Sequence, residues 1–253
     1  MLGNDVVDLE DVDARPETFR RRFDARVFSD EERRAIAADP DPQARRWAHW
    51  GAKEAAYKLA RQIDPRFVFS PARLVARFEP RSASSGERRG RLEVLAGPGG
   101  LPMTAELRSF ETRDSVHVVA RPAGADWEGV AMAVESVSDR NEEPGLAVRR
   151  LAVREIAREL GVETGRLSIG RRGRIPFLEL DGRPTALALS LSHHGRFVAY
   201  AMAPRGRSRI ALRADRSEGD EDGAAGGRGQ EVVQSSGFVG YPLGFADTAW
   251  MAG

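Results

Sequence analysis

The longest stretch with helical periodicity in the sequence most limits how this chain can fold. It starts at Asp41, which is followed by Pro42 in the favoured first helical position, and it runs to about Gln62. One stripe of this helix carries apolar residues at helical spacing: Ala48, Ala52, Ala55 and Leu59. A stripe of this kind faces a protein core, so the rest of the chain must supply a surface for it to pack on.

A second stripe on the same helix mixes aromatic and charged residues. It comprises Trp47, Trp50, Glu54, Lys58 and Arg61. The chain holds 39 lysines and arginines, and Lys53 and Lys58 are the only lysines among them. In a chain that uses arginine almost everywhere, a lysine indicates a need for a compact ammonium charge, which a planar guanidinium does not replace.

Strand-like segments precede and follow this helix. GNDVVDL, at residues 3–9, predicts a short strand, and VFSDEE has the capping-box pattern that begins a helix, with Ser29 and Glu32. From Phe67 to Arg121 the segments FVF, RLVARF, GRLEVLA, TAELRSF and SVHVVARP alternate with Gly- and Ser-rich breaks. These segments predict an antiparallel sheet that packs on the long helix.

The second part of the chain repeats this order of elements. GVAMAVESV predicts a strand, residues 146–161 predict an amphipathic helix that stops at its final glycine, and residues 167–204 predict further strands. We therefore predict an α+β fold, a tandem duplication of a small antiparallel sheet packed on a long helix, with pseudo-twofold symmetry. The predicted parts are 1–128, 129–205 and a charged, Gly-rich tail at 206–253 that is expected to be disordered.

Composition argues against several classes of protein. A hydrophobic fraction of 41% supports a core, and a net charge of +1 gives little support to nucleic-acid binding. The absence of cysteine excludes disulfides and thiolate metal sites. The N-terminus lacks the regions of a signal peptide, and no run approaches the roughly 20 apolar residues of a membrane span. We expect a cytoplasmic protein with no membrane partner.

Two carboxylates stand in unusual surroundings. Asp5 lies in an apolar strand, and Glu54 lies among tryptophans. Mg²⁺ keeps several waters and is held by one or two carboxylates together with substrate phosphate, so this pair with Lys58 predicts a phosphate site. The alternatives are a solvated strand end for Asp5 and, for Glu54, an ion pair with Lys58 that contributes about 0.2–0.5 kcal/mol.

Four short motifs together resemble the 4′-phosphopantetheinyl transferases. GNDVVDL is similar to the family's G-x-D strand, VFSDEE to its F-[ST]-x-x-E turn, WGAKEAAYK to its W-x-x-K-E-A-x-x-K helix and LSLSHHG to its S-x-S-H strand. The resemblance implies transfer of phosphopantetheine from coenzyme A to a serine of an acyl or peptidyl carrier protein, with Mg²⁺ and release of adenosine 3′,5′-bisphosphate. Such carriers serve fatty acid, polyketide or nonribosomal peptide biosynthesis.

The resemblance also implies roles for single residues. It makes Asp5 and Glu54 the metal ligands, and it places Lys58 beside the reacting phosphate, either to stabilise charge or to accept a proton. His193, together with Ser192, would contact the phosphates of coenzyme A.

Arginine is expected to bind the 3′-phosphate of coenzyme A, because its fork matches a phosphate with two hydrogen bonds. The candidates are Arg150 and Arg154 on the second helix, and Arg174 in a segment that resembles the family's G-[KR]-P. Arg183, in D-G-R-P, competes with Arg174, and the sequence does not decide between them.

Three further residues have less defined expectations. Lys53 lies on a different helix face from Lys58 and would help through phosphate or carrier contacts. His194 is expected to be a neighbour of His193 without a role. Long family members often carry a third acid at the position of Val7, so water is expected as the third metal ligand.

The order of the motifs is that of the short holo-acyl-carrier-protein synthases, whereas long family members have the S-x-S-H half first. Because each half lacks the other's motif, we expect one active site between the halves of a monomer. The alternatives are a catalytically silent coenzyme A- or carrier-binding module, and an arginine-rich nucleic-acid binder that lacks a recognisable motif.

Overall fold

The computed structural model describes residues 1–15, 22–82, 85–95, 103–137 and 142–205, and the predicted tail at 206–253 lies outside them. The α-helices are α1 (Phe23–Val27), α2 (Asp30–Ala37), α3 (Pro42–Ile63) and α4 (Pro144–Leu160). The strands of the first part are β1 (Gly3–Asp8), β2 (Leu74–Phe78), β3 (Glu87–Val94), β4 (Met103–Glu111) and β5 (Ser115–Pro122). Those of the second part are β6 (Ala131–Ser136), β7 (Leu167–Arg172), β8 (Ile175–Leu180), β9 (Arg183–Pro184), β10 (Leu187–His194) and β11 (Phe197–Pro204).

The helix ends follow the predicted capping residues. The Ser29 hydroxyl accepts a hydrogen bond from the Glu32 amide at 3.2 Å, and the Glu32 carboxylate accepts one from the Ser29 amide at 2.8 Å, which completes the capping box. Asp41 caps α3 by accepting from the Ala44 amide at 3.0 Å, and α4 ends at Gly161 with a φ of 65°. Within the described residues, no helix is long and apolar enough to span a membrane.

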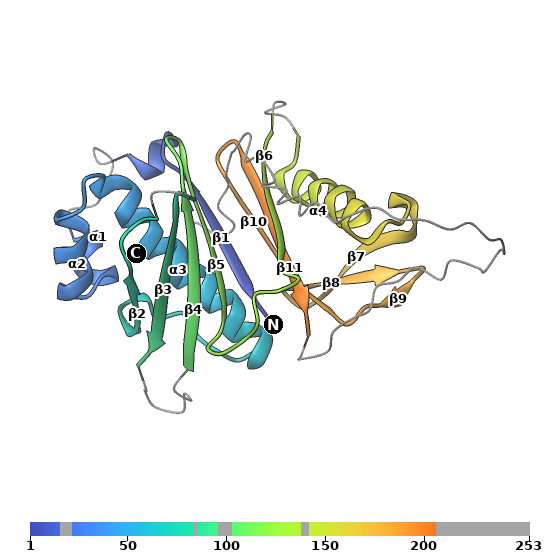
Figure 1. The fold of residues 1–253 in the computed structure, drawn as a ribbon, viewed down its shortest axis with the longest axis horizontal. Helices are drawn as coiled ribbons and strands as arrows, with labels where there is room; N and C mark the ends of the chain where they lie inside the picture. Colours follow the sequence, from blue (N-terminus) through green and yellow to red (C-terminus); the bar gives the residue numbers. More distant parts are fainter. Residues whose placement is uncertain (16–21, 83–84, 96–102, 138–141, 206–253) are drawn as a thin grey trace, which may run out of the picture.

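The first part is an antiparallel sheet in the order β1-β5-β4-β3-β2, and α3 packs on β1 and β5 (Figure 1). This confirms the predicted sheet on the long helix. The segment FVF is not a strand: Phe69 packs instead against Trp50 and Tyr57, with ring centroids 5.9 and 5.0 Å apart. The aromatic stripe of α3 thus packs against a neighbouring loop.

The second part has the same connection order. Its first strand, β6, pairs antiparallel with its last strand, β11, as β1 pairs with β5, and in both parts a long helix follows the first strand. The sheet order is β10-β11-β6, and a further small sheet, β7-β8-β9, extends from it. The α+β fold is confirmed. Duplication would explain this equivalence and stays a hypothesis, as does the division at residues 128 and 129.

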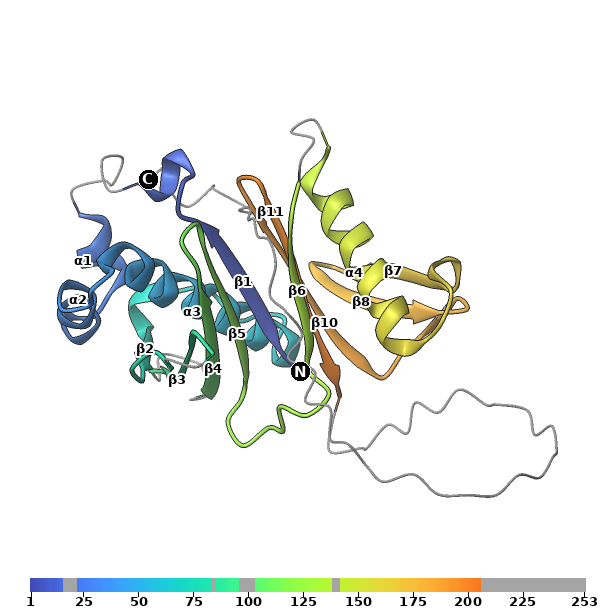
Figure 2. The ribbon, with the colours of Figure 1, turned by 45° about the horizontal axis from the view of Figure 1, so that its top comes forward.

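The two main sheets lie next to each other, with β1 against β10 and β11, between the two long helices (Figure 2). Alternate residues of β10 divide between the layers: Leu189 belongs to the apolar cluster with α4, whereas Ala188 packs with Leu2 and Val119 of the first sheet. This follows from the two-residue repeat of a strand. As a consequence, β1 lies between α3 on one side and β10 on the other, where residues from both parts meet.

Candidate active site

The site begins with the close contact of β1 and α3. A Cβ atom on Gly3 would lie 2.0 Å from the carbonyl oxygen of Ala55 and 2.7 Å from the amide nitrogen of Leu59. Glycine therefore lets the strand approach the helix backbone more closely than any other residue does. Two residues along β1, the Asp5 side chain points to the same face and reaches the helix.

Lys58 joins α3 to β1 and β10. Its Nζ donates to Asp5 Oδ1 at 2.8 Å, to the Asn4 carbonyl oxygen at 3.0 Å and to Ser192 Oγ at 3.1 Å. Ser192, on β10, also donates to Asp5 Oδ1 at 2.9 Å. The three donors of the ammonium group are all used. The structure thus brings together Asp5, Lys58 and Ser192, which are distant in sequence.

The second oxygen of Asp5 lies close to α3. Asp5 is only 6% exposed, so it is not a solvated strand end, and its Oδ2 is buried without a hydrogen-bond partner among the described residues. A Cβ on Gly51 would lie 3.8 Å from this oxygen. Glu54 is half-buried on the helix face that Gly51 and Lys58 share. A carboxylate oxygen with an unfilled acceptor beside a second carboxylate suits a hard cation.

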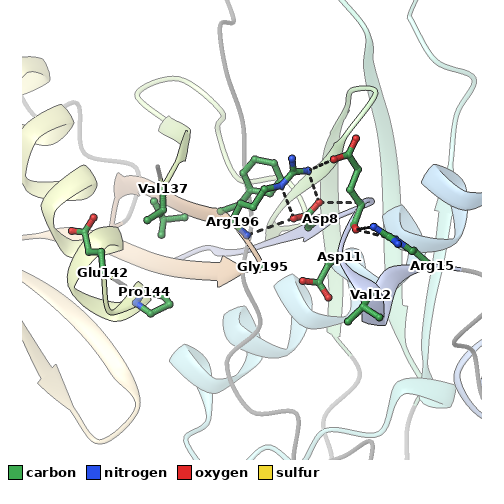
Figure 3. Close-up of a pocket in the computed structure, with 12 residues that line it drawn as sticks. Asp8, Asp11, Val12, Arg15, Val137, Glu142, Pro144, Gly195 and Arg196 are labelled. Carbon is green, nitrogen blue, oxygen red and sulfur yellow. Dashed lines mark hydrogen bonds and ion pairs between the residues drawn. The ribbon is translucent and has the colours of Figure 1, made fainter. Parts of the chain in front are cut away.

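A cleft of about 510 Å³ opens at the end of β1, between the two parts (Figure 3). Asp8, Glu10, Asp11, Val12 and Arg15 line one side, and residues 195–198 with Val137, Glu142 and Pro144 line the other. Asp8 is 1% exposed and accepts two hydrogen bonds from Arg196, at 2.9 and 3.0 Å. Arg196 also contacts Glu10 at 2.9 Å. These pairs connect the β10–β11 turn to the segment after β1.

A comparison with known families bears on this arrangement. Residues 1–89 match the family model of the 4′-phosphopantetheinyl transferase superfamily. This match covers the first part of the chain, up to β3. A comparison with curated proteins gives no match. Among solved structures, the holo-[acyl-carrier-protein] synthase (AcpS) of Thermotoga maritima is similar, with 14% sequence identity, a TM-score of 0.28, and coverage of 72% of this chain and 83% of that chain.

The matched segment contains only part of the candidate site described above. Asp5, Glu54 and Lys58 lie within it, whereas Ser192 and His193 lie beyond it. The link between the two groups is therefore the geometry of β1, α3 and β10, in which Ser192 bonds directly to Asp5 and Lys58.

His193 lies on the opposite face of β10 from Ser192, toward the start of α4. Burial lowers its pKa, and the charge of Lys58 lowers it further, while Glu143 and Asp5 act in the opposite direction. Glu143 caps α4 by accepting from the amides of Gly145 and Leu146 at 3.0 and 2.8 Å. The imidazole is thus neutral at neutral pH and lies within the electric field of both Lys58 and Asp5.

The candidate phosphate-binding arginines lie on the second part. Arg150 pairs with Glu142 at 2.8 and 3.0 Å, and Arg154 pairs with Glu135 and Glu155. Arg174 and Arg183 are exposed on the small sheet, at the β7–β8 turn and in β9. Recruitment of Arg150 or Arg154 to a phosphate would therefore require exchange of an existing carboxylate partner.

The expected contact of Lys53 with phosphate or carrier is wrong in this structure. Lys53 is 0% exposed, and its Nζ donates to Glu32 at 2.9 Å, to the Pro71 carbonyl at 3.1 Å and to the Leu74 carbonyl. Burial alone would raise the pKa of Glu32, but contact with His49 and the charge of Lys53 bring it down to about 2. Lys53 has a structural role: it joins α2, α3 and the start of β2.

The expectation that His194 has no role is wrong, because this residue contributes to the contact between the two parts. Its Nδ1 accepts a hydrogen bond from the Asp8 amide at 3.0 Å. Burial lowers the pKa of His194 to about 3, so the ring is neutral and Nδ1 keeps its lone pair. The available signal was strand alternation, because His194 lies two residues after Ser192 and must point to the same side of β10.

Proposed function

We propose that the protein transfers 4′-phosphopantetheine from coenzyme A to a serine of an apo acyl or peptidyl carrier protein, in a Mg²⁺-dependent reaction that releases adenosine 3′,5′-bisphosphate. The observation that carries this proposal is the contact of Lys58, Asp5 and Ser192 across the two parts, next to the unfilled Asp5 Oδ2. The match of residues 1–89 to the superfamily supports phosphopantetheinyl transfer as the reaction class.

Asp5 and Glu54 are the residues that would hold Mg²⁺. Asp5 supplies the buried Oδ2, and Glu54 lies on the helix face next to it. Within the described residues, no three metal-binding side chains gather at one point, so the remaining positions belong to water and substrate phosphate, as is usual for this ion. The bound ion would offset the negative charge of the coenzyme A pyrophosphate.

Lys58 acts on the phosphate that carries pantetheine. The serine Oγ forms a bond to this phosphorus, the phosphorus–oxygen bond to adenosine 3′,5′-bisphosphate breaks, and the serine proton passes to the Glu54 carboxylate. The three acceptors around Nζ require a protonated ammonium. Of the two roles open to Lys58, we therefore assign it the stabilisation of negative charge on the transferred group.

The second part would bind the rest of coenzyme A. We assign His193 and Ser192 to its phosphates because both lie at the end of β10: Ser192 bonds to Asp5 and Lys58, and the charges of the same two residues act on His193 from the other face of the strand. Arg174 or Arg183 remains our assignment for the 3′-phosphate, with Arg150 and Arg154 as further candidates. Since both motifs lie on one chain, we propose that a monomer has a complete site.

Incubation with coenzyme A, Mg²⁺ and an apo carrier protein tests the proposal. We expect the carrier mass to increase by one phosphopantetheine, with no increase when the acceptor serine of the carrier is changed to alanine. Lys58→Met in a folded protein should abolish the gain. A protein that binds coenzyme A without any mass gain would be a catalytically silent module, and the proposed transfer would be wrong.

A further inference from the structure

The two parts meet along β1 and β10 through side chains. β1 is the edge strand of its sheet and β10 is the edge strand of its own, so each has unpaired backbone groups. The Asn4 amide donates to Ser190 Oγ at 2.9 Å, and the Asp8 amide donates to His194 Nδ1 at 3.0 Å. Both pairs are 186 residues apart in sequence, so the strands run in the same direction in a constant register.

Ser192 lies midway between these two contacts. Residues Ser190, Ser192 and His194 follow one another at intervals of two, so their side chains point to the same face of β10. The two outer residues hold backbone amides of β1, while Ser192 bonds to the Asp5 carboxylate and Lys58 ammonium. A shift of β10 along β1 would therefore move Ser192 away from Asp5.

We call this contact between β1 and β10 the seam. Close packing also fixes its end. Gly195 has a φ of 54°, and a Cβ on it would lie 2.7 Å from Asp8 Oδ2 and 2.9 Å from Asp11 Oδ2. The turn after His194 therefore fits closely against the segment after β1. A Cβ there would have to displace both carboxylates or separate the strands.

We propose that Ser190 and His194 are positioning residues: by accepting the amides of Asn4 and Asp8, they set the register in which Ser192 meets Asp5 and Lys58. Neither residue touches the reacting groups. The register itself is independent of the proposed function, whereas its consequence for turnover rests on the proposed phosphopantetheinyl transfer.

Three substitutions test the seam. His194→Asn keeps a side-chain acceptor near the position of Nδ1, and His194→Leu removes it at similar volume. Ser190→Ala removes the other acceptor with a loss of one oxygen, which keeps the test possible if the leucine variant does not fold. Ser168→Ala is the matched control, because Ser168 is exposed on β7 and bonds to Glu179 at 2.7 Å, far from the seam in the fold.

The two lysines provide a readout that does not depend on activity. In protein labelled with ¹³Cε,¹⁵Nζ-lysine, the spectrum contains one signal from Lys53 and one from Lys58. Lys53 is buried between α2, α3 and β2 and reports on the first part alone. We expect His194→Leu and Ser190→Ala to shift the Lys58 signal and leave the Lys53 signal in place, and His194→Asn and Ser168→Ala to leave both unchanged.

Transfer kinetics on the same variants measure how the register affects turnover. We expect kcat to fall roughly 10- to 100-fold in His194→Leu and Ser190→Ala, with KM for coenzyme A changed less than about threefold, and His194→Asn to recover most of the loss. An unchanged Lys58 signal in both His194→Leu and Ser190→Ala would overturn the positioning role. If the substitutions shift the Lys58 signal but the wild-type protein has no transfer activity, the positioning role stands and the proposed function is refuted.

Discussion

At the residue scale, both lysines occupy positions that use all three donors of an ammonium group. Lys53 bonds to Glu32 and two carbonyls in a closed space, and Lys58 bonds to Asp5, Asn4 and Ser192 at the meeting of the two parts. A guanidinium is larger and planar, and its donors lie in one plane. This geometry explains why the arginine-rich chain keeps lysine at these positions.

Lys58→Arg should lower turnover by roughly 10²-fold or more, because the planar head cannot take the place of Nζ between the three acceptors. Coenzyme A binding should weaken much less, since the positive charge is kept. Steady-state kinetics and calorimetric titration of coenzyme A measure the two effects. Arg66→Lys, at a side chain that is 91% exposed, is the control for an arginine–lysine exchange. Near-normal turnover in folded Lys58→Arg would contradict the assigned role.

Lys53→Met should reduce the free energy of unfolding by about 3–5 kcal/mol, because it leaves the Glu32 charge buried without its partner. Urea unfolding at pH 7 measures this loss. The double variant Glu32→Gln/Lys53→Met should lose less than the sum of its two single changes, since the two side chains are in direct contact. Additive losses would show that the pair does not act as a unit.

At the scale of elements, the contact of β1 with α3 determines where Asp5 lies. The strand and helix pack backbone to backbone at Gly3, where the alanine stripe of α3 leaves room. The capping box and the Asp41 cap fix where α2 and α3 begin. The position of the site therefore depends on small residues as much as on charged ones.

Gly3→Ala should destabilise the protein by about 3 kcal/mol or more, because its Cβ would lie 2.0 Å from the Ala55 carbonyl oxygen. The change should also lower turnover by moving Asp5. Gly165→Ala is the matched control, as a Cβ there meets nothing within 4 Å. Thermal unfolding followed by circular dichroism compares the two, and equal melting temperatures would refute the close approach.

At the scale of the whole molecule, burial keeps histidines neutral between the two parts. Burial lowers the pKa of His117 and of His194 to about 3, from an ordinary value of 6.5. His117 lies in β5, and its Nε2 lies 3.3 Å from the side-chain Nδ2 of Asn4. Both residues are at or next to the seam, so protonation acts on the contact between the parts.

Acidification should destabilise the fold. Because the folded-state pKa values are lowered, the stability that these groups contribute is fully present above pH 6.5 and is lost as the pH falls toward 3. Lowering the pH from 7.5 to 5.0 should reduce the free energy of unfolding by about 2 kcal/mol for each of these histidines. Urea unfolding at both values measures the loss. His194→Asn should remove about half of the pH dependence that these two histidines cause, and an unchanged dependence would contradict this account.

Because one chain supplies Asp5, Lys58 and Ser192, the protein should be active as a monomer. Size-exclusion chromatography with light scattering, followed by transfer assays across a dilution series, tests this. Specific activity should stay constant on dilution. Activity that disappears as an oligomer dissociates would show that a site is shared between chains.

Much of the fold follows from local sequence patterns. The helix ends, the strands of both parts and the α+β class could be predicted, because caps, strand alternation and helical spacing act over a few residues. The prediction of a strand at FVF was wrong, because Phe69 packs against aromatic side chains of α3 rather than in a sheet. Asp5, Glu54 and Lys58 stood out because a charged residue in an apolar setting is locally visible.

Local sequence patterns are enough to identify the unusual residues and the motifs that resemble those of the family. Which of these residues meet depends on the packing of the whole chain. Lys53 and Lys58 lie on the same helix, yet one is enclosed with Glu32 and the other reaches Ser192. Likewise, His194 gains its role from the amide of Asp8, which lies 186 residues away. Such contacts depend on how two sheets settle against each other, and that packing is set by the sum of many distant contacts rather than by local spacing.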